Sequence, residues 1–454
     1  MADVAHGLAN APTRPAVIGL GKLGAAMAAA FAERGLSVLG VDVDERAVDA
    51  LNAGRPPAPE AGLETLIRRN RDRLGATTDT AEAVVRSDIV FVIVPTPSRS
   101  DGGFATDYAA ATFRAIGAAL RHKATPLTVV LTSTVLPGAT RNTLLPVLEQ
   151  ESGKQAGVGF HLCYSPEFIA LGSAVRDFLN PDFILIGEHE KVAGDRLEAF
   201  YGTVLENDAP SRRMGLENAE LAKLALNAYV TNKITFANVL ADLCERLPGG
   251  DVDAVTGALA LDSRIGGKYL TGGAPYGGPC FPRDNAALAR VAEDLKVDAG
   301  LMHAVDRNNH ERPHTWARYL QAWLAPGDTV AVLGLAYKPG SHVVEAAPGL
   351  LLARELAAAG IAVVACDPMI PADAWAAYPE AEAVTLTVVD DARDAIGRAR
   401  AVCLASPDPA FRDLSPDLFA GRLVVDFWRR HAGVLAGRAD VTYVGAGLAP
   451  SDAP

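Results

Sequence analysis

One cysteine stands in a setting that favours chemistry. Cys280 follows a Gly-Gly-Pro turn at residues 277–279, and the chain from Asn285 onward is expected to form a helix. A thiol close to a helix N-terminus and to Arg283 is favoured as the thiolate, the form that attacks carbon. An isolated cysteine is more often an inert core residue, and an acid such as Asp284 is common at the start of a helix. A cysteine that only fills the core would not need the Gly-Gly-Pro turn before it, however. Cys280 is therefore a candidate nucleophile.

Three further side chains could serve proton transfer or charge stabilisation. Glu167 lies in Ser-Pro-Glu-Phe at residues 165–168, where partial burial beside a proline and an aromatic ring would suit a carboxylate to acid–base catalysis. Lys223 and Asn227 are four residues apart, so one face of a helix would present an ammonium and an amide to a substrate oxygen. Taken singly, a solvated carboxylate and a surface lysine are the commoner interpretations.

A glycine motif predicts a dinucleotide site. Residues 19–24 read Gly-Leu-Gly-Lys-Leu-Gly between an expected strand and an expected helix, and Asp42 ends the next strand. Gly19 allows a tight turn, Gly21 lets the backbone approach a pyrophosphate, and Gly24 allows close helix packing. Asp42 would accept the ribose hydroxyls, which favours NAD over NADP. The alternative is a glycine turn that serves packing alone.

The elements around these residues alternate short apolar runs with amphipathic stretches, which predicts an α/β fold with doubly wound parallel sheets. A second such pattern begins near Asp328. Between them, residues 217–247 contain no glycine or proline and predict one helix of about 30 residues, a dimer interface or an ordinary core helix. The expected divisions are a flexible leader (1–14), an N-terminal NAD-binding Rossmann domain (15–212), a central helical dimerisation region with the cysteine (213–325), a C-terminal Rossmann-like nucleotide-sugar-binding domain (326–445) and a flexible tail (446–454).

Composition excludes several classes of protein. The net charge of -12 disfavours binding to nucleic acid, and no apolar run is long enough to span a membrane. The N-terminus lacks the features of a secretory signal. The five cysteines are far apart and odd in number, which argues against a disulfide framework or a zinc site and fits a reducing cytoplasm. No metal and no membrane partner are expected.

The ordered set of motifs resembles the UDP-glucose/GDP-mannose dehydrogenase family from about residue 15 to residue 443. Further matching segments lie at 94–97, 133–135, 180–182, 264–269 and 334–339. The resemblance implies two Rossmann-like domains joined by a long central helix that forms the core of a homodimer or higher even oligomer. It also implies oxidation of a nucleotide sugar, by default UDP-glucose, at C6 from alcohol to carboxylate, giving a UDP-uronic acid for polysaccharide biosynthesis with NAD as the cofactor.

The same resemblance assigns roles to individual residues. Cys280 would attack the C6 aldehyde to give a thiohemiacetal and then a thioester, and Glu167 would act in the acid–base steps. Lys223 and Asn227 would stabilise the oxyanion, and Asp284 with Thr134 would position water. The cofactor-binding residues would be Gly19, Leu20, Gly21, Lys22, Leu23, Gly24, Asp42, Thr96, Pro97 and Thr134. The substrate-binding residues would be Glu167, Phe168, Ile169, Lys223, Asn227, Arg264, Tyr269, Leu270, Tyr276, Gly277, Phe281 and Lys338.

The chain departs from the family pattern at three positions. Leu171 stands where the family has a second acid near the cofactor, Glu345 stands where it has an arginine that reaches the cofactor, and Pro279 replaces a serine before the cysteine. Other substrates of the same chemistry are UDP-N-acetylhexosamine, UDP-galactose and GDP-mannose. A two-electron β-hydroxyacid dehydrogenase would share the glycine motif without needing Cys280, and a non-catalytic NAD-binding paralogue would need none of the catalytic residues.

Overall fold

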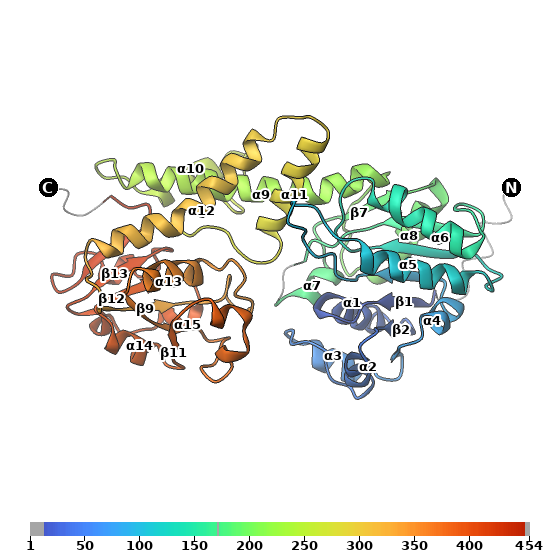
Figure 1. Cartoon of the computed structure of the whole chain (residues 1–454), viewed down its shortest axis with the longest axis horizontal. Coiled ribbons are helices and arrows are strands. Elements are labelled where there is room, and N and C mark those ends of the chain that lie inside the picture. The colour runs from blue at the N-terminus through green and yellow to red at the C-terminus, as the bar shows by residue number, and fades with distance from the viewer. Residues whose placement is uncertain (1–12, 170–171, 450–454) are drawn as a thin grey trace. The chain divides into compact units, whose positions relative to one another are not determined.

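The computed structural model describes residues 13–169 and 172–449, and the chain divides after Leu224 into two compact units (Figure 1). Most of the expected leader, the end of the expected tail and Leu171 lie outside the described residues. Among the helices that the structure describes, none is both long and apolar enough to cross a membrane.

The first unit contains an eight-stranded sheet in the order β3-β2-β1-β4-β5-β6-β7-β8. The expectation of a parallel sheet is correct for β1 to β6. It is wrong for β7 and β8, because β7 runs antiparallel to β6 and β8 runs parallel to β7. The strands are β1 (Pro15–Ile18), β2 (Val38–Val41), β3 (Leu74–Thr77), β4 (Ile89–Val92), β5 (Leu127–Leu131), β6 (Phe160–Tyr164), β7 (Ile184–Glu188) and β8 (Ser211–Gly215).

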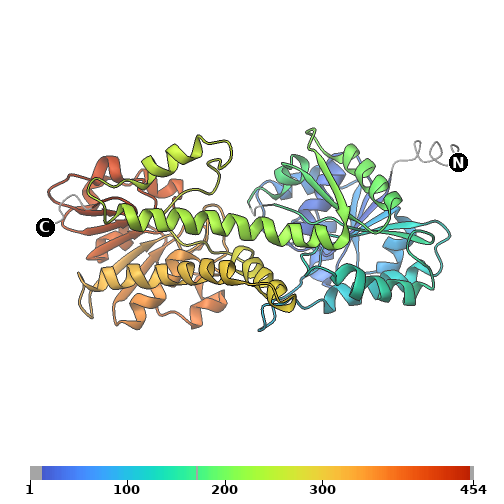
Figure 2. The ribbon, with the colours of Figure 1, turned by 90° about the horizontal axis from the view of Figure 1, so that it is seen from above.

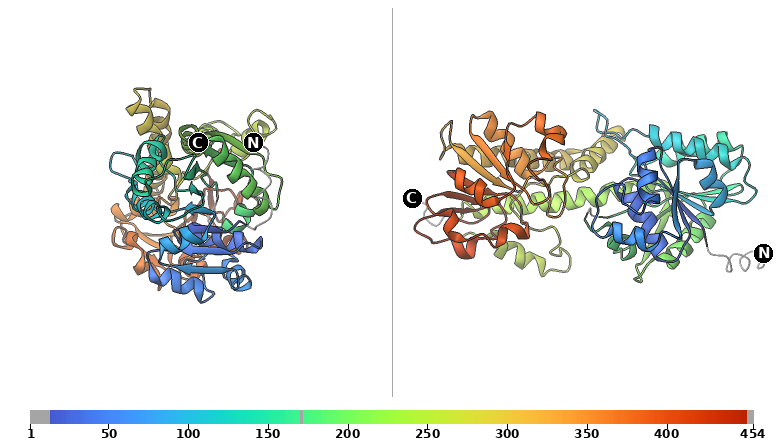
Figure 3. Two further views of the ribbon diagram at one scale, coloured as in Figure 1. Left: turned by 90° about the vertical axis from the view of Figure 1, so that its right-hand side faces the viewer. Right: turned by 90° about the horizontal axis from the view of Figure 1, so that it is seen from below.

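Both faces of this sheet are covered, as alternate residues of β1 show. Val17 packs into one hydrophobic core, whereas Ala16 and Ile18 pack into the other, so the strand is apolar throughout. Helices flank the strands on both sides (Figure 3). They are α1 (Lys22–Glu33), α2 (Glu45–Asn52), α3 (Leu63–Arg69), α4 (Thr80–Arg86), α5 (Asp107–Leu120), the π-helix η1 (Thr140–Leu144), α6 (Leu145–Ser152), α7 (Ala174–Leu179) and α8 (Lys191–Val204).

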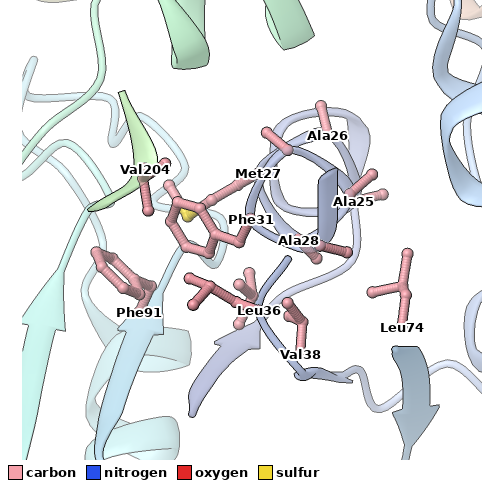
Figure 4. Packing of buried hydrophobic residues seen from close by; sticks show 14 of the residues in the cluster. Ala25, Ala26, Met27, Ala28, Phe31, Leu36, Val38, Leu74, Phe91 and Val204 are labelled. Carbon is pink, nitrogen blue, oxygen red and sulfur yellow. The ribbon is translucent and has the colours of Figure 1, made fainter. Parts of the chain in front are cut away.

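Helix α1 lies close to the sheet because its buried residues are small. Every residue from Gly24 to Ala32 is buried, and six of these nine residues are alanines. The bulkier Phe31 fills the space toward the sheet, with its ring centroid 5.1 Å from that of Phe91 (Figure 4). This packing holds the N-terminus of α1 against the end of β1, where the glycine motif lies.

Side chains cover both edges of the sheet. At β3, the side-chain amide of Asn52 donates to the Ala76 carbonyl oxygen (3.0 Å) and accepts from the Ala76 N–H (2.8 Å), as a neighbouring strand would. At β8, Arg213 forms ion pairs with Glu188, Asp195 and Glu198.

The second unit contains a six-stranded parallel sheet in the order β11-β10-β9-β12-β13-β14. Val330 and Val332 of β9 pack into one core and Ala331 and Leu333 into another, so this sheet is also covered on both faces. Its strands are β9 (Thr329–Leu333), β10 (Ala362–Cys366), β11 (Thr387–Val388), β12 (Ala401–Leu404), β13 (Leu423–Asp426) and β14 (Thr442–Gly445).

The long helix predicted at residues 217–247 is α9 (Leu216–Cys244), which runs without interruption for 29 residues (Figure 2). Helix α11 begins at Phe281, four residues earlier than expected, because a proline in the first turn of a helix has no N–H that needs a partner. The other helices are α10 (Val252–Ala260), α11 (Phe281–Asp294), α12 (Gly300–Gln321), α13 (Pro348–Ala358), α14 (Ala392–Arg398), α15 (Pro409–Arg412), α16 (Ala432–Leu435) and the 3-10 helices η2 (Trp375–Ala377), η3 (Pro379–Glu382) and η4 (Pro416–Phe419).

Candidate active site

The glycine motif forms a tight turn between β1 and α1. Gly19 has a φ of 102°, which favours glycine, and a Cβ there would overlap the carbonyl oxygen of Ile93. A Cβ on Gly24 would overlap the carbonyl oxygen of Gly19, so helix and strand approach as closely as their backbones allow. A Cβ on Gly21 would meet nothing within 4 Å, so this part of the turn faces open space. These features fit a bound pyrophosphate.

Asp42 follows β2 and holds this turn. Its carboxylate accepts the N–H of Leu20 at 2.6 Å and the N–H of Asp44 at 2.9 Å. A carboxylate has about four acceptor positions, so Asp42 retains capacity for the two ribose hydroxyls of NAD. The same negative charge would repel the 2′-phosphate of NADP.

We expect Asp42→Ala to reduce the preference for NAD over NADP by about tenfold to a hundredfold, the value of a hydrogen bond to a charged group. The variant also loses the bonds to Leu20 and Asp44, but this loss affects both cofactors. The measurement is therefore the ratio of kcat/KM for NAD to that for NADP. Asp44→Ala, which removes the N-cap of α2 and the ion pair with Arg46 but leaves Asp42 in place, is the control. An unchanged ratio in Asp42→Ala would contradict the role.

The predicted residues Thr96 and Thr134 follow β4 and β5 and lie together. The Thr96 hydroxyl donates to the Thr134 carbonyl oxygen at 2.7 Å. The Ser133 hydroxyl accepts the N–H of Val94 and donates to the carbonyl oxygen of the same residue. Pro97 continues the same loop. The carboxyl ends of β1, β2, β4 and β5 therefore carry all the predicted cofactor-binding residues, which is where open α/β sheets bind dinucleotides.

Lys223 of α9 lies over the loop that follows β6. Its ammonium is buried, donates to the main-chain carbonyl of Glu167 at 2.5 Å and is 4.8 Å from the ring centroid of Phe168. Among the described residues it has no carboxylate within ion-pair distance, so its charge is not neutralised by a fixed anion. The Glu167 carboxylate accepts the N–H of Ile169 at 2.7 Å. The structure thus brings four predicted residues together in the first unit.

Asn227, one helical turn further along α9, already belongs to the second unit and meets a carboxylate of α11 in that same unit. Its amide donates to Asp284 at 2.6 Å, and Arg283 pairs with the other oxygen of that carboxylate at 3.3 Å. Asp284 is 1% exposed. Cys280 is the N-cap residue of α11, and its carbonyl oxygen accepts the N–H of Asp284 in the first turn. The nucleophile candidate, the carboxylate and the amide therefore form one cluster.

Cys280 differs from the other four cysteines in accessibility. All five are among the described residues, none forms a disulfide, and only Cys280 is exposed. Burial raises the pKa of Cys366 to about 11, and it also raises the pKa of Cys163, Cys244 and Cys403. These four thiols are core residues, as an isolated cysteine usually is.

The predicted substrate-binding residues of the second unit are placed unevenly. The Phe281 ring contacts the rings of Tyr269 and Tyr276 edge to face, and Leu270 and Gly277 are buried beside them in the chain. Lys338 lies over the ring of Tyr337, with 5.7 Å between its Nζ and the ring centroid. Arg264 is different, because it is 86% exposed and paired with Asp262.

The second unit contains a similar arrangement of two glycines and an aspartate after its first two strands. Gly334 follows β9 with a φ of 110°, and a Cβ on Gly349 of α13 would overlap its carbonyl oxygen. Asp367 follows β10 and accepts the N–H groups of Leu335 and Ala336, both at 2.8 Å. The chain between the two glycines is longer than in the first unit and contains Lys338 and Glu345. The main-chain carbonyl of Glu345 accepts the N–H of Gly278 at 2.9 Å.

Two groups of buried polar residues were not identified from the sequence. Glu220 of α9 accepts the N–H groups of Gly138 and Thr140, and burial raises its pKa. Asn238 of α9 and Asn309 of α12 bond the chain that precedes Cys280. Asn238, one turn from Ile234 and from Ala241 on α9, was an available signal, whereas Asn309 lies in a polar stretch of α12 and gave none. Within the described ranges no cluster of His, Cys, Asp or Glu side chains is arranged to hold a metal ion.

Comparison with known proteins shows the same family over most of the chain. The UDP-glucose/GDP-mannose dehydrogenase family matches with its NAD binding domain at residues 13–205, its central domain at 217–311 and its UDP binding domain at 331–431.

Individual relatives match over nearly their whole length. UDP-glucose 6-dehydrogenase AglM of Haloferax volcanii is 36% identical over 90% of this chain and 95% of the relative. GDP-mannose 6-dehydrogenase of Azotobacter vinelandii is 33% identical over 91% of this chain and 96% of the relative. The solved structure of a UDP-glucose dehydrogenase from the archaeon Pyrobaculum islandicum is 35% identical, with a TM-score of 0.88 over 97% of this chain and 99% of that one.

Three consecutive domain models of one family match this chain, and the match to the NAD binding domain contains the glycine turn. The chain therefore belongs to the UDP-glucose/GDP-mannose dehydrogenase family and is an NAD-dependent nucleotide-sugar dehydrogenase.

Proposed function

We propose that this enzyme oxidises the C6 alcohol of a nucleotide sugar, by default UDP-glucose, to the carboxylate through a thioester on Cys280. The observation that carries the proposal is the position of that thiol. Of the five cysteines it alone is exposed, and it stands at the start of α11 beside a buried carboxylate and its amide partner. UDP-glucose 6-dehydrogenase is the name of the relative from Haloferax volcanii.

Cys280 supplies the covalent step. When bound, NAD accepts a hydride in each of the two oxidations. Between them, the Cys280 thiolate forms a C–S bond to the C6 aldehyde while the carbonyl π electrons move to oxygen, giving a thiohemiacetal after protonation. Loss of hydride from C6 and of the hydroxyl proton leaves the thioester. Water then forms a C–O bond, the C–S bond breaks, and the carboxylate and the thiolate are released.

The charged residues divide the remaining work. The Lys223 ammonium, which has no carboxylate partner among the described residues, is suited to stabilise negative charge on the C6 oxygen. Asn227 assists as a second donor through its amide. Glu167 transfers protons in the formation and hydrolysis of the thioester, and Asp284 with Thr134 positions the water.

The test is to count NADH for each sugar consumed in a screen of nucleotide sugars, with the products identified by mass. We expect a ratio of two and a product that carries a new carboxylate. A ratio of one would indicate a two-electron dehydrogenase, and no turnover with any sugar would favour a non-catalytic NAD-binding protein. The same screen separates UDP-glucose from UDP-galactose, UDP-N-acetylhexosamine and GDP-mannose, the substrate in the name of the Azotobacter relative.

The enzyme is further proposed to be a homodimer or higher even oligomer built on α9. One side of this helix in the second unit exposes large apolar side chains at heptad-like spacing, with Tyr229 60%, Phe236 51% and Leu243 52% exposed. Monomeric proteins rarely leave a continuous apolar stripe in water. A second copy of the same stripe would cover it by two-fold symmetry.

We expect Phe236→Glu to convert the oligomer to a monomer in light scattering, because pairing would bury the new charge. Val192→Glu on α8 is the matched control, since that side chain is also 51% exposed. It should leave the oligomer intact. A wild-type protein that is monomeric at micromolar concentration would refute the proposal.

A further inference from the structure

The chain that leads to Cys280 is buried although it forms no helix or strand. Residues 272–278 are all buried. Buried backbone N–H and C=O groups need hydrogen-bond partners, and an irregular segment cannot supply them from its own neighbours. Side chains of α9 and α12 supply them instead. They therefore fix the path by which the chain reaches the thiol.

Asn309 of α12 makes the central contact. Its side-chain oxygen accepts the N–H of Tyr276 at 2.8 Å, and its side-chain nitrogen donates to the Tyr276 carbonyl at 3.0 Å. The amide thus pairs both main-chain groups of one residue, as a neighbouring β-strand would. Asn309 is 6% exposed, so water does not readily replace either bond.

Two other side chains hold the start of the same segment. Arg312, one turn beyond Asn309 on α12, donates twice to the Gly273 carbonyl, at 2.9 and 2.7 Å. Asn238 of α9 accepts the N–H of Gly273 at 2.8 Å and donates to the Ala274 carbonyl at 3.1 Å. Asn309 is therefore the last side-chain anchor of the main chain before the two glycines that precede the cysteine turn.

On its opposite side, the segment is packed tightly against the chain that follows β9. A Cβ on Gly277 would overlap the carbonyl oxygen of Ala346, and one on Gly278 would lie 2.6 Å from the Tyr337 ring. The N–H of Gly278 donates to the Glu345 carbonyl. The chain just before Cys280 is thus held between α12 and the loop after β9, and a small displacement at Tyr276 must be passed on to the cysteine.

Helix α12 also holds the chain after the cysteine. The carboxylate of Asp306, one turn before Asn309, accepts the Tyr276 hydroxyl at 2.9 Å and the Asn285 amide at 2.8 Å. Asn285 follows Asp284 near the start of α11. One face of α12 therefore contacts the residues on both sides of Cys280.

We propose that Asn309 is a positioning residue for Cys280. It acts by fixing the Tyr276 backbone and hence the direction in which the thiol leaves the start of α11. The inference rests on the proposed role of Cys280 as nucleophile. A misplacement of about 1 Å in a reacting group can cost about a hundredfold in rate.

The test uses Asn309→Asp, which keeps the shape and the acceptor for the Tyr276 N–H but sets a carboxylate oxygen against the Tyr276 carbonyl. We expect kcat to fall by about tenfold to a hundredfold with the KM for nucleotide sugar and NAD within about threefold of wild type. The rate at which iodoacetamide alkylates Cys280 should also change several-fold. Because the other four cysteines are buried, this labelling reports Cys280 in the intact enzyme.

Asn218→Asp makes the same substitution at an exposed position of α9 and is the control for added charge. If Asn309→Asp does not fold, Asp306→Asn provides the second variant, because it removes the charge but keeps an acceptor for Tyr276 and Asn285. That variant should lower kcat and change the alkylation rate in the same sense, by a smaller factor. Circular dichroism and the melting temperature establish folding.

Several results would overturn the inference. They are a folded Asn309→Asp enzyme with wild-type kcat, a rise in KM alone, or a loss of turnover with no change in alkylation. A lower melting temperature with both rates unchanged would show a purely structural role. Failure of the proposed function is distinguishable, since it would appear as acid formation by Cys280→Ala, whereas the alkylation rate reports the position of the thiol whether or not it is the nucleophile.

Discussion

Replacing Cys280 with alanine is expected to abolish release of the uronic acid, with a loss of several orders of magnitude in kcat, because the covalent route is removed outright. The variant should fold normally, because an exposed side chain at the start of a helix contributes little to stability. Binding of the nucleotide sugar should therefore remain close to wild type. The measurements are NADH formation, product mass and the mass of the quenched protein, which should carry no sugar adduct.

Cys280→Ser gives the complementary result. The hydroxyl can form an ester or stall, and an oxygen ester hydrolyses less readily than a thioester, so little free acid should appear. Cys403→Ala is the control, because that thiol is fully buried in β12. It should lower stability and leave kcat within about tenfold. A Cys280→Ala enzyme that still releases acid near the wild-type rate would show that the thiol is not the nucleophile.

Gly24→Ala is the second substitution with a large expected effect. The added Cβ would overlap the carbonyl oxygen of Gly19 and lie 2.9 Å from Ile93 Cγ2, so α1 must move away from the end of β1. Overpacking of this kind costs about 1–3 kcal/mol or more, and it displaces the turn that faces the cofactor. We expect NAD affinity to fall by more than about tenfold, together with a lower melting temperature.

Calorimetry of NAD binding and thermal unfolding would measure both effects. Gly202→Ala is a matched control, because Gly202 also lies within a helix, α8, and its Cβ would meet nothing within 4 Å. That variant should gain up to about 1 kcal/mol of stability, as alanine usually does in a helix. Normal NAD binding by Gly24→Ala would show that the close contact between α1 and β1 is dispensable.

Sequence reasoning succeeds where one local pattern determines the structure. The glycines at 19–24 and the apolar strand before them specify a turn, and the absence of glycine and proline from residues 217–247 specifies a long helix. Both are present. The observed ends of α9 and the observed start of α11 differ from the predicted ones by a few residues, because each helix end is determined by one or two capping residues. β8 was missed because an edge strand can be polar, and it reads Ser-Arg-Arg-Met-Gly.

What the sequence could not provide is the set of partners of buried polar groups. Asn309 bonds Tyr276 across 33 residues and Asn227 bonds Asp284 across 57. The hydrogen-bond partners of these residues cannot be predicted from their type or spacing, because the contacts form only when the helices pack together. The reversed direction of β7 has the same origin. Strand direction depends on where the connection places the chain, and the apolar run is the same in either direction.

The covered edges of the eight-stranded sheet bear on aggregation. Exposed strand edges allow sheets of different molecules to join. Here Asn52 occupies the bonding groups of Ala76 at one edge, and ion pairs of Arg213 crowd β8 at the other. Hydrogen bonds from Lys191 and Arg213 lower the pKa of Asp195, and hydrogen bonds from Ser211 and Arg213 lower the pKa of Glu198. The carboxylates therefore stay charged through the usual carboxylate range, and the ion pairs are lost only as pH falls through the lowered values. Acid below the usual carboxylate range should therefore open the β8 edge and allow strand-to-strand association there.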